Sequence, residues 1–262
     1  MVKNFYFLCG LPRAGNTLFA SIINQNPDVA VTANSPTAEM FYRIGMLINS
    51  EYLKGFPDFK SLENVIKNIL PNYYSDWKQS HIIDRQLWGE INVLNLLKLH
   101  IKNELKIIIM VRNVEEVLAS FIKLSRLTAD NFINHETFTV EEQCNKLMDK
   151  NGMIMKQLQS ISNLLSIENK KYTHLIEYND LVKNPKKEID AVYDFLNIPK
   201  FEHKYKNMEQ LEINGIKYDD SIFGVDLHKI RTNSIKKADY NVEDILPKHI
   251  IEKSKALNIW KQ

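Results

Sequence analysis

The chain has 262 residues, of which 44% are hydrophobic and 25% are charged, so it can bury a sizeable core and lacks the composition of a disordered protein. Its 34 basic residues nearly balance 32 acidic ones, and the formal net charge of +2 excludes a general electrostatic attraction to nucleic acid or to an anionic membrane. No apolar stretch approaches the roughly 18 residues of a membrane span, and the two cysteines lack metal-site spacing, so we expect one reduced, cytoplasmic domain over residues 1–262.

The first predicted element is a short buried strand over residues 5–9, which a loop joins directly to a helix. The loop runs from Gly10 to Thr17 and reads GLPRAGNT. After it, the apolar residues at 18, 19, 22 and 23 recur at helical spacing. A glycine-containing loop in this position directs backbone N–H groups, and the positive end of the helix dipole, at an anion. The loop therefore predicts a phosphate-binding site, with a plain Gly/Pro turn as the alternative.

The residue after the second glycine distinguishes this loop from that of the common nucleotide-triphosphate enzymes. Their loop reads G-x-x-x-x-G-K-[ST], and its lysine neutralises the β- and γ-phosphates. Here Asn16 occupies the lysine position, and Arg13 places a cation earlier in the turn. We interpret this exchange as evidence against an ordinary kinase or ATPase.

Strand-like and helix-like patterns alternate along the rest of the chain. The predicted strands cover residues 81–84, 106–111 and 172–178. The predicted helices cover residues 90–103, 114–126, 141–167 with a kink near Gly152, and a segment opened by Pro185. Residues 200–248 are poorly periodic and predict a long loop region able to fold over a ligand. The alternation predicts an α/β fold, a three-layer sandwich in which helices flank a central parallel sheet.

Arginine is scarce in this lysine-rich chain, which makes its positions informative. The six arginines stand at positions 13, 43, 85, 112, 126 and 231. Arginine offers a rigid fork that binds phosphate or sulfate with two hydrogen bonds. Arg112 follows the strand predicted over 106–111, at the end where parallel sheets bind ligands, and Ser120 comes eight residues later in the next helix. The alternative is that Arg112 merely pairs with Glu115 or Glu116.

Together, the two motifs resemble those of the sulfotransferases that use 3′-phosphoadenosine-5′-phosphosulfate (PAPS). The family's first loop reads P-[RK]-S-G-[ST]-T and matches residues 12–17, and its second signature is an arginine and a serine at the separation of Arg112 and Ser120. The resemblance implies that the 5′-phosphosulfate is held by Arg13, Ala14, Gly15, Asn16 and Thr17, and that the 3′-phosphate is held by Arg112 and Ser120. Two positions depart from the pattern, because Ala14 offers only its backbone N–H and Asn16 offers an amide where a hydroxyl is common.

Two later segments extend the resemblance. Residues 177–185 and 193–199 are similar to the family's Y-E-D-L-x-x-x-P and F-L-x-I-P segments, which implies that Tyr178 lies near the adenine. Residues 227–231 are similar to a segment that closes over the donor, which implies that Arg231 reaches the 3′-phosphate. The alternatives are that Tyr178 is a core residue of a strand and that Arg231 is a surface arginine.

The resemblance also implies a P-loop-type fold and a reaction. A sulfuryl group passes in line from PAPS to a hydroxyl or amine acceptor, leaving 3′-phosphoadenosine-5′-phosphate (PAP), and no metal is required. Arg13 and Arg85 are the expected catalytic cations, since the family often carries a lysine near position 85. The positions of the family's usual bases hold side chains that cannot accept a proton. Glu39 is therefore the preferred base, and Asp84 is the alternative.

The sequence leaves other functions and the partners open. A P-loop kinase-like phosphotransferase without the usual lysine is one alternative, and a catalytically inactive nucleotide-binding module is another. The acceptor is a small molecule, glycan, lipid or peptide, selected by loops around 35–80 and 125–140 whose chemistry is too generic to identify it. We expect no nucleic-acid partner and no membrane span, and a homodimer stays open.

Overall fold

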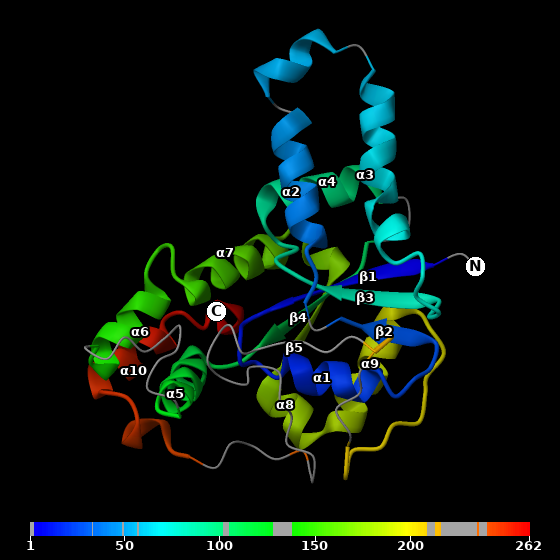
Figure 1. The fold of residues 1–262 in the computed structure, drawn as a ribbon. Coiled ribbons are helices and arrows are strands. Elements are labelled where there is room, and N and C mark those ends of the chain that lie inside the picture. Colours follow the sequence, from blue (N-terminus) through cyan, green and yellow to red (C-terminus); the bar gives the residue numbers. More distant parts are fainter. Residues whose placement is uncertain are drawn as a thin grey trace.

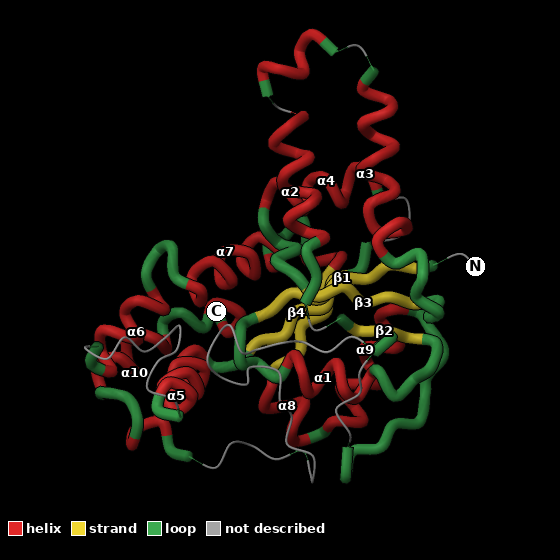
Figure 2. The backbone as a smooth tube through the Cα atoms, viewed as in Figure 1, coloured by secondary structure: helices red, strands yellow, loops and turns green. Residues whose placement is uncertain are grey.

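A parallel sheet forms the centre of the computed structural model, which describes residues 3–32, 34–48, 50–56, 58–101, 105–127, 138–208, 213–215, 235 and 240–262. The sheet has five strands in the order β2-β3-β1-β4-β5, and all paired strands run parallel. The strands are β1 (Asn4–Gly10), β2 (Val29–Val31), β3 (His81–Arg85), β4 (Ile107–Val111) and β5 (Thr173–Glu177). Helices cover both faces of the sheet, with α1, α8 and α9 on one face and α7 on the other (Figures 1 and 2). The predicted three-layer α/β fold is confirmed.

One or more helices follow each strand along the chain. The α-helices are α1 (Asn16–Ile23), α2 (Thr37–Ile48), α3 (Phe59–Tyr73), α4 (Ile91–His100), α5 (Val114–Ser125), α6 (Val140–Met148), α7 (Met153–Leu165), α8 (Tyr178–Lys183), α9 (Pro185–Leu196) and α10 (Lys248–Lys255). Short 3-10 turns are η1 (Glu51–Gly55), η2 (Lys170–Tyr172), η4 (Val242–Asp244) and η5 (Ile259–Lys261). Helices α2 and α3 form a hairpin that projects away from the sheet, with η1 at its tip (Figure 1). In the described part of the chain, no helix has the length and apolar character needed to cross a membrane.

The central strands are buried on both faces, which explains their uninterrupted apolar sequences. All five residues of β4 are buried, and in β1 the buried run is Tyr6 to Gly10. Gly10 pairs with Met110, and a Cβ atom on Gly10 would lie only 2.4 Å from the Met110 carbonyl oxygen. The absence of a side chain therefore lets β1 and β4 approach closely at their carboxyl ends. Because Leu8 also pairs with Arg85, the ends of β1, β3 and β4 meet at one edge of the sheet.

Three expectations about local structure are corrected. The helix predicted over 141–167 is two helices, α6 with Thr139 as its N-cap and α7 with Gly152 as its N-cap. The strand predicted over 172–178 ends at Glu177, and Tyr178 is the first residue of α8. The region 35–80, expected to supply acceptor-selecting loops, contains α2 and α3.

Candidate active site

The loop between β1 and α1 is a compact turn at the carboxyl edge of the sheet. Arg13 has φ 60° and Gly15 has φ 84°, so both adopt the left-handed backbone conformation. A non-glycine residue there is uncommon, and such residues concentrate at functional sites. Ala14 between them is fully buried, and its N–H donates to the Leu11 carbonyl at 3.4 Å. The expected donor at Ala14 is thus partly engaged inside the loop.

Asn16 and Thr17 begin helix α1. Their backbone N–H groups belong to the first turn, which has no partners within the helix and can receive an anion. The Asn16 side chain is buried, and its Nδ2 donates to the Leu11 carbonyl at 2.8 Å. Its Oδ1 is buried without a hydrogen-bond partner among the described residues. The Asn16 amide therefore stabilises the loop from within. It does not supply the positive charge of the lysine that other phosphate-binding loops carry at this position.

Arg112 links the second motif to the first. The residue follows β4 and is 5% exposed. Its Nε donates to Glu116 Oε2 at 2.9 Å, its Nη1 donates to the Arg13 carbonyl at 3.2 Å, and its Nη2 donates to the Tyr240 hydroxyl at 3.2 Å. These bonds use three of the five guanidinium N–H groups. The ion pair weighed as an alternative is present, and the same side chain also reaches the loop.

The side chain of Arg13 completes the link between the two motifs. Its Nε donates to the Ser120 hydroxyl of α5 at 3.2 Å. Arg13 thus contacts the second motif through its side chain, and Arg112 contacts the first motif through the Arg13 carbonyl. The four residues expected to bind the two ends of one donor, Arg13, Gly15, Arg112 and Ser120, lie at the same edge of the sheet.

Tyr178 packs between the two motifs. The Arg112 guanidinium carbon lies 4.4 Å from the centre of the Tyr178 ring, a cation–π contact. A Cβ atom on Gly15 would lie 2.6 Å from the same ring. Gly15 is therefore required both by its backbone conformation and by the close approach of Tyr178.

Tyr240 is a contact of this site that sequence reasoning missed. Its hydroxyl accepts from Arg112 and donates to the Glu116 carbonyl at 3.3 Å, and Lys123 Nζ lies 4.7 Å from its ring centre. No motif or periodicity marks Tyr240 in the sequence. Arg231, expected at the 3′-phosphate, lies outside the described residues.

Arg85 ends β3 beside the first loop. Its side chain is half-buried, and its backbone N–H donates to the Thr32 hydroxyl at 2.9 Å. Burial raises the pKa of the neighbouring Cys9 thiol, and the charge of Arg85 opposes that shift. A cation is thus present near the carboxyl end of β1.

The two candidate bases have opposite environments. Glu39 lies in the first turn of α2 with its side chain 60% exposed, and it forms an ion pair with Arg43 at 2.6 Å. Asp84 is 0% exposed, and burial raises the pKa of its carboxyl against the effect of several hydrogen bonds. Only Glu39 is accessible to an acceptor in this arrangement.

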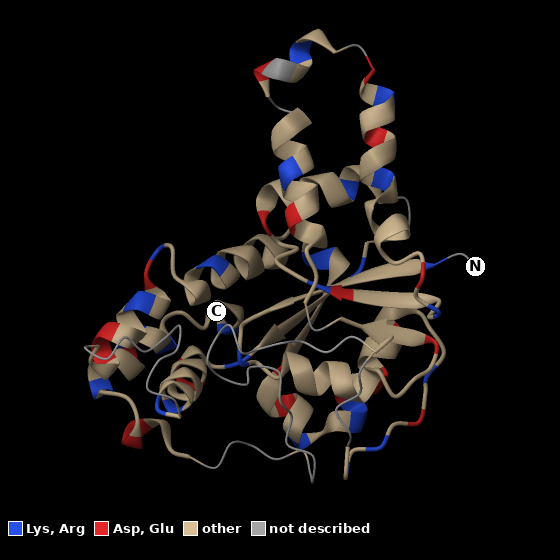
Figure 3. Cartoon of the chain, in the orientation of Figure 1, with Lys and Arg blue, Asp and Glu red and all other residues tan. Residues whose placement is uncertain are grey.

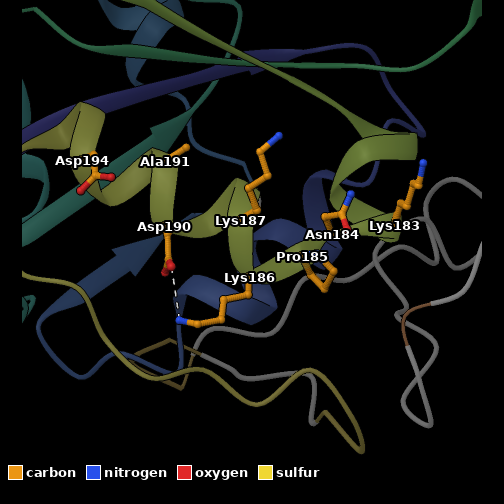
Figure 4. Close-up of a pocket in the computed structure, with 8 residues that line it drawn as sticks. All are labelled: Lys183, Asn184, Pro185, Lys186, Lys187, Asp190, Ala191 and Asp194. Atoms are coloured by element: carbon orange, nitrogen blue, oxygen red, sulfur yellow. Dashed lines mark hydrogen bonds and ion pairs between the residues drawn. The ribbon is translucent and has the colours of Figure 1, made fainter.

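A separate groove of about 780 Å³ lies at the junction of α8 and α9 (Figure 4). It is lined by Lys183, Asn184, Pro185, Lys186, Lys187, Asp190, Ala191 and Asp194. Lys186 pairs with Asp190 at 3.2 Å, so part of its positive charge is neutralised. None of the predicted site residues that the structure describes lines this groove. Among the described residues, no cluster of three or more His, Cys, Asp or Glu side chains could hold a metal.

Comparisons with known proteins identify both a family and a fold. The family model described as "Sulfotransferase domain" matches residues 4–220. The sulfotransferase domain from the curacin biosynthetic pathway is 17% identical with a TM-score of 0.59, over 98% of this chain and 97% of that one. A mouse sulfotransferase complexed with PAP is 14% identical with a TM-score of 0.58, over 97% and 83%. The sulfotransferase domain of the Synechococcus PCC 7002 olefin synthase is 14% identical with a TM-score of 0.52, over 100% and 96%. No curated protein matches the sequence significantly.

Proposed function

Since the chain belongs to the sulfotransferase domain family, we propose that it transfers a sulfuryl group from PAPS to a hydroxyl or amine acceptor. The observation that carries this proposal is the contact between its two anion-binding motifs. Arg13 Nε donates to Ser120 at 3.2 Å, and Arg112 donates to the Arg13 carbonyl at 3.2 Å. One strand-to-helix loop alone would suit many phosphorylated ligands. Two joined motifs favour a ligand with two separate anionic groups, such as PAPS.

The proposed donor site combines backbone and side-chain donors. Its residues are Arg13, Ala14, Gly15, Asn16 and Thr17 for the 5′-phosphosulfate, Arg112, Ser120 and Arg231 for the 3′-phosphate, and Tyr178 for the adenine. The first turn of α1 supports the assignment to the 5′-phosphosulfate, because its backbone N–H groups have no partners within the helix. The described contacts of Arg112 use three of its five guanidinium N–H groups. The other two support the assignment to the 3′-phosphate. The mouse neighbour was solved with PAP, which supports the same class of donor.

The proposed reaction is a direct displacement at sulfur. The acceptor oxygen or nitrogen forms a bond to sulfur while the bond from sulfur to the bridging phosphate oxygen breaks. The bridging oxygen keeps the electron pair and leaves as part of PAP, and the acceptor proton passes to a base. We assign Arg13 and Arg85 to the negative charge that grows on the leaving phosphate, since fixed cations aimed at developing charge lower such barriers.

Glu39 is the proposed base. It is the exposed one of the two candidate carboxylates, and it lies in the first turn of a helix that starts at the carboxyl edge of the sheet. Both side chains of its ion pair with Arg43 are exposed, so the ion pair is weak and an acceptor can replace Arg43. Replacing Glu39 with glutamine should lower kcat while leaving PAP binding unchanged, and full turnover in that variant would exclude it as the base.

Ligand-dependent stability tests the donor assignment. A ligand that binds only the folded protein at 100 times its Kd adds about 2.7 kcal/mol to the free energy of unfolding. We expect PAP to raise the Tm measured by scanning fluorimetry, with magnesium-ATP having much less effect. Transfer is then measured with radiolabelled PAPS and a panel of hydroxyl and amine compounds. No Tm shift at saturating PAP would refute the donor, and a larger shift with magnesium-ATP would favour a kinase-like phosphotransferase.

A further inference from the structure

Asp84 is a buried carboxylate in β3 that three hydroxyl groups surround. Ser35 Oγ lies 2.8 and 2.9 Å from its two carboxylate oxygens, and Thr37 Oγ1 donates to Oδ2 at 2.7 Å. The Tyr74 hydroxyl also donates to Oδ2. Tyr74 is fully buried, as are Thr37 and Asp84 itself. The carboxylate is therefore satisfied entirely from within the protein.

The backbone of Asp84 also receives a hydrogen bond from a buried side chain. Trp88 Nε1 donates to the Asp84 carbonyl at 2.8 Å. The fully buried Trp88 ring meets Phe7 of β1 edge-on, with ring centres 4.6 Å apart, and Phe41 of α2, with centres 5.8 Å apart. The carboxyl end of β3 is thereby tied both to the central strand and to the first helix of the hairpin.

The hydroxyl partners of Asp84 come from both ends of the α2–α3 hairpin. Thr37 is the first residue of α2, and Tyr74 directly follows the last residue of α3. A single carboxylate thus holds both ends of the hairpin, whose projection from the sheet is visible in Figure 1. The next residue along β3 is Arg85, so an acidic and a basic position are neighbours at the end of this strand (Figure 3).

A buried carboxylate is a costly way to attach a hairpin. Its desolvation penalty is large, and well-packed apolar residues often hold a similar position at lower cost. What a carboxylate adds is direction, because its hydrogen bonds fix the angles at which α2 and α3 leave the sheet. Such orientation matters most where reacting groups must meet, since a shift of about 1 Å can cost about 100-fold in rate.

We propose that Asp84 is a positioning residue for the transfer step. Through Thr37 it sets the start of α2, which carries the proposed base Glu39. It touches neither donor nor acceptor. The donor loop follows β1 and Arg112 follows β4, and the hydrogen bonds described above for these residues go to partners outside the hydroxyl cluster. Loosening the cluster therefore impairs transfer to the acceptor and leaves donor binding intact. This inference rests on the proposed function.

Two matched pairs of variants test the proposal. Thr37→Val removes a hydroxyl from the cluster at nearly constant shape, and Thr37→Ser retains it. Tyr74→Phe removes a buried hydroxyl from the cluster, and Tyr193→Phe removes a buried hydroxyl elsewhere, one that contacts Asn26 at 3.1 Å and His203 at 3.0 Å. For each variant, calorimetry gives the Kd of PAP. Radiolabelled transfer gives kcat and KM for the best acceptor from the panel that tests the proposed function.

The expected outcomes separate positioning from general stability. Thr37→Val and Tyr74→Phe should keep the Kd of PAP within about twofold and lower kcat/KM for the acceptor on the order of tenfold. Thr37→Ser and Tyr193→Phe should behave like the wild type in both measurements. If Tyr74→Phe matches Tyr193→Phe in kcat/KM, or if PAP binding falls in parallel with transfer, the proposal is overturned. Wild-type protein that neither binds PAP nor transfers sulfuryl overturns the proposed function, and this inference with it.

Discussion

The Arg112 side chain combines a structural and a proposed binding role in one guanidinium group. Burying an arginine is tolerable here because Glu116 supplies the opposite charge at 2.9 Å and two oxygen acceptors satisfy further N–H groups. The Tyr178 ring packs against its flat face. These contacts fix the guanidinium group before any ligand arrives. Its other N–H groups therefore lose less conformational entropy when a ligand binds.

This arrangement predicts a selective loss of affinity in an Arg112 variant. Arg112→Ala should weaken PAP binding by roughly 10- to 100-fold, because hydrogen bonds to charged groups contribute about 1.5–3 kcal/mol. Adenosine 5′-phosphosulfate lacks the 3′-phosphate, so its affinity should change little. Calorimetry with both ligands makes the comparison. The control is Arg112→Ala combined with Glu116→Gln, which avoids leaving a buried unpaired carboxylate. Equal losses for both ligands would contradict the 3′-phosphate role.

The pairing of β1 with β4 sets the spacing of the two anion-binding motifs. Gly10 lies opposite Met110, and each strand continues directly into one motif.

The sequence predicted both strands because parallel strands covered on both faces are continuous apolar runs. It did not predict α2 and α3, whose region was expected to form loops, and it joined α6 to α7. Helical periodicity continues across residues 149–152, whereas the break depends on the Gly152 backbone, where a Cβ would lie 2.5 Å from the Leu147 carbonyl.

The close strand contact predicts that Gly10→Ala is harmful. The added Cβ would meet the Met110 carbonyl oxygen at 2.4 Å, so β1 and β4 must separate. Overpacking of this kind costs about 1–3 kcal/mol, and each kcal/mol lowers the Tm by about 2–4 °C in a protein of this size. PAP binding should weaken as well, because the motifs move apart. Gly55→Ala is the matched control, since a Cβ there meets no atom of the described residues within 4 Å. Equal Tm values for the two variants would contradict this account.

At the scale of the whole molecule, four histidines are wholly or partly buried. Burial lowers the pKa of His81, His100, His174 and His203 below the unfolded value of 6.5. His203 lies against Tyr193 and Phe201, and its Nε2 lies 3.0 Å from the Tyr193 hydroxyl. Protonation therefore favours the unfolded chain. The stability that these groups supply is complete above the unfolded pKa and is lost as the pH falls below it. Asp84 acts with the opposite sign, because burial raises its pKa.

The histidines predict a loss of stability in mild acid. The Tm of the wild type should fall between about pH 7.5 and about pH 5.5, where histidines begin to gain protons. In His203→Phe the fall should be smaller, because one of the groups that resists protonation is gone. Thermal denaturation followed by circular dichroism across this range makes the comparison. A wild-type Tm that stays constant, or an identical fall in the variant, would contradict the assignment.

Across the whole chain, what could be predicted was local, and what was missed was long-range. The loop at Gly10–Thr17 and the position of Arg112 after a strand are encoded by neighbouring residues. The contact of Arg112 with Tyr240 joins residues 128 positions apart, and that of Thr37 with Asp84 joins residues 47 apart. No periodicity encodes such pairs, because they depend on how the helices pack on the sheet. The sequence therefore placed Asp84 among the candidate bases, whereas the fold surrounds it with hydroxyl groups.

The contacts of Arg112 also determine how the protein can be divided. They reach back to Arg13 and forward to Tyr240 along the chain. A cut at any peptide bond between these two residues separates at least one partner of the guanidinium group from it in sequence. A ribosome likewise releases the Gly10–Thr17 loop long before it synthesises Tyr240. The arrangement around Arg112 therefore belongs to no single fragment, and a growing or cleaved chain holds it only after its distant parts have folded together.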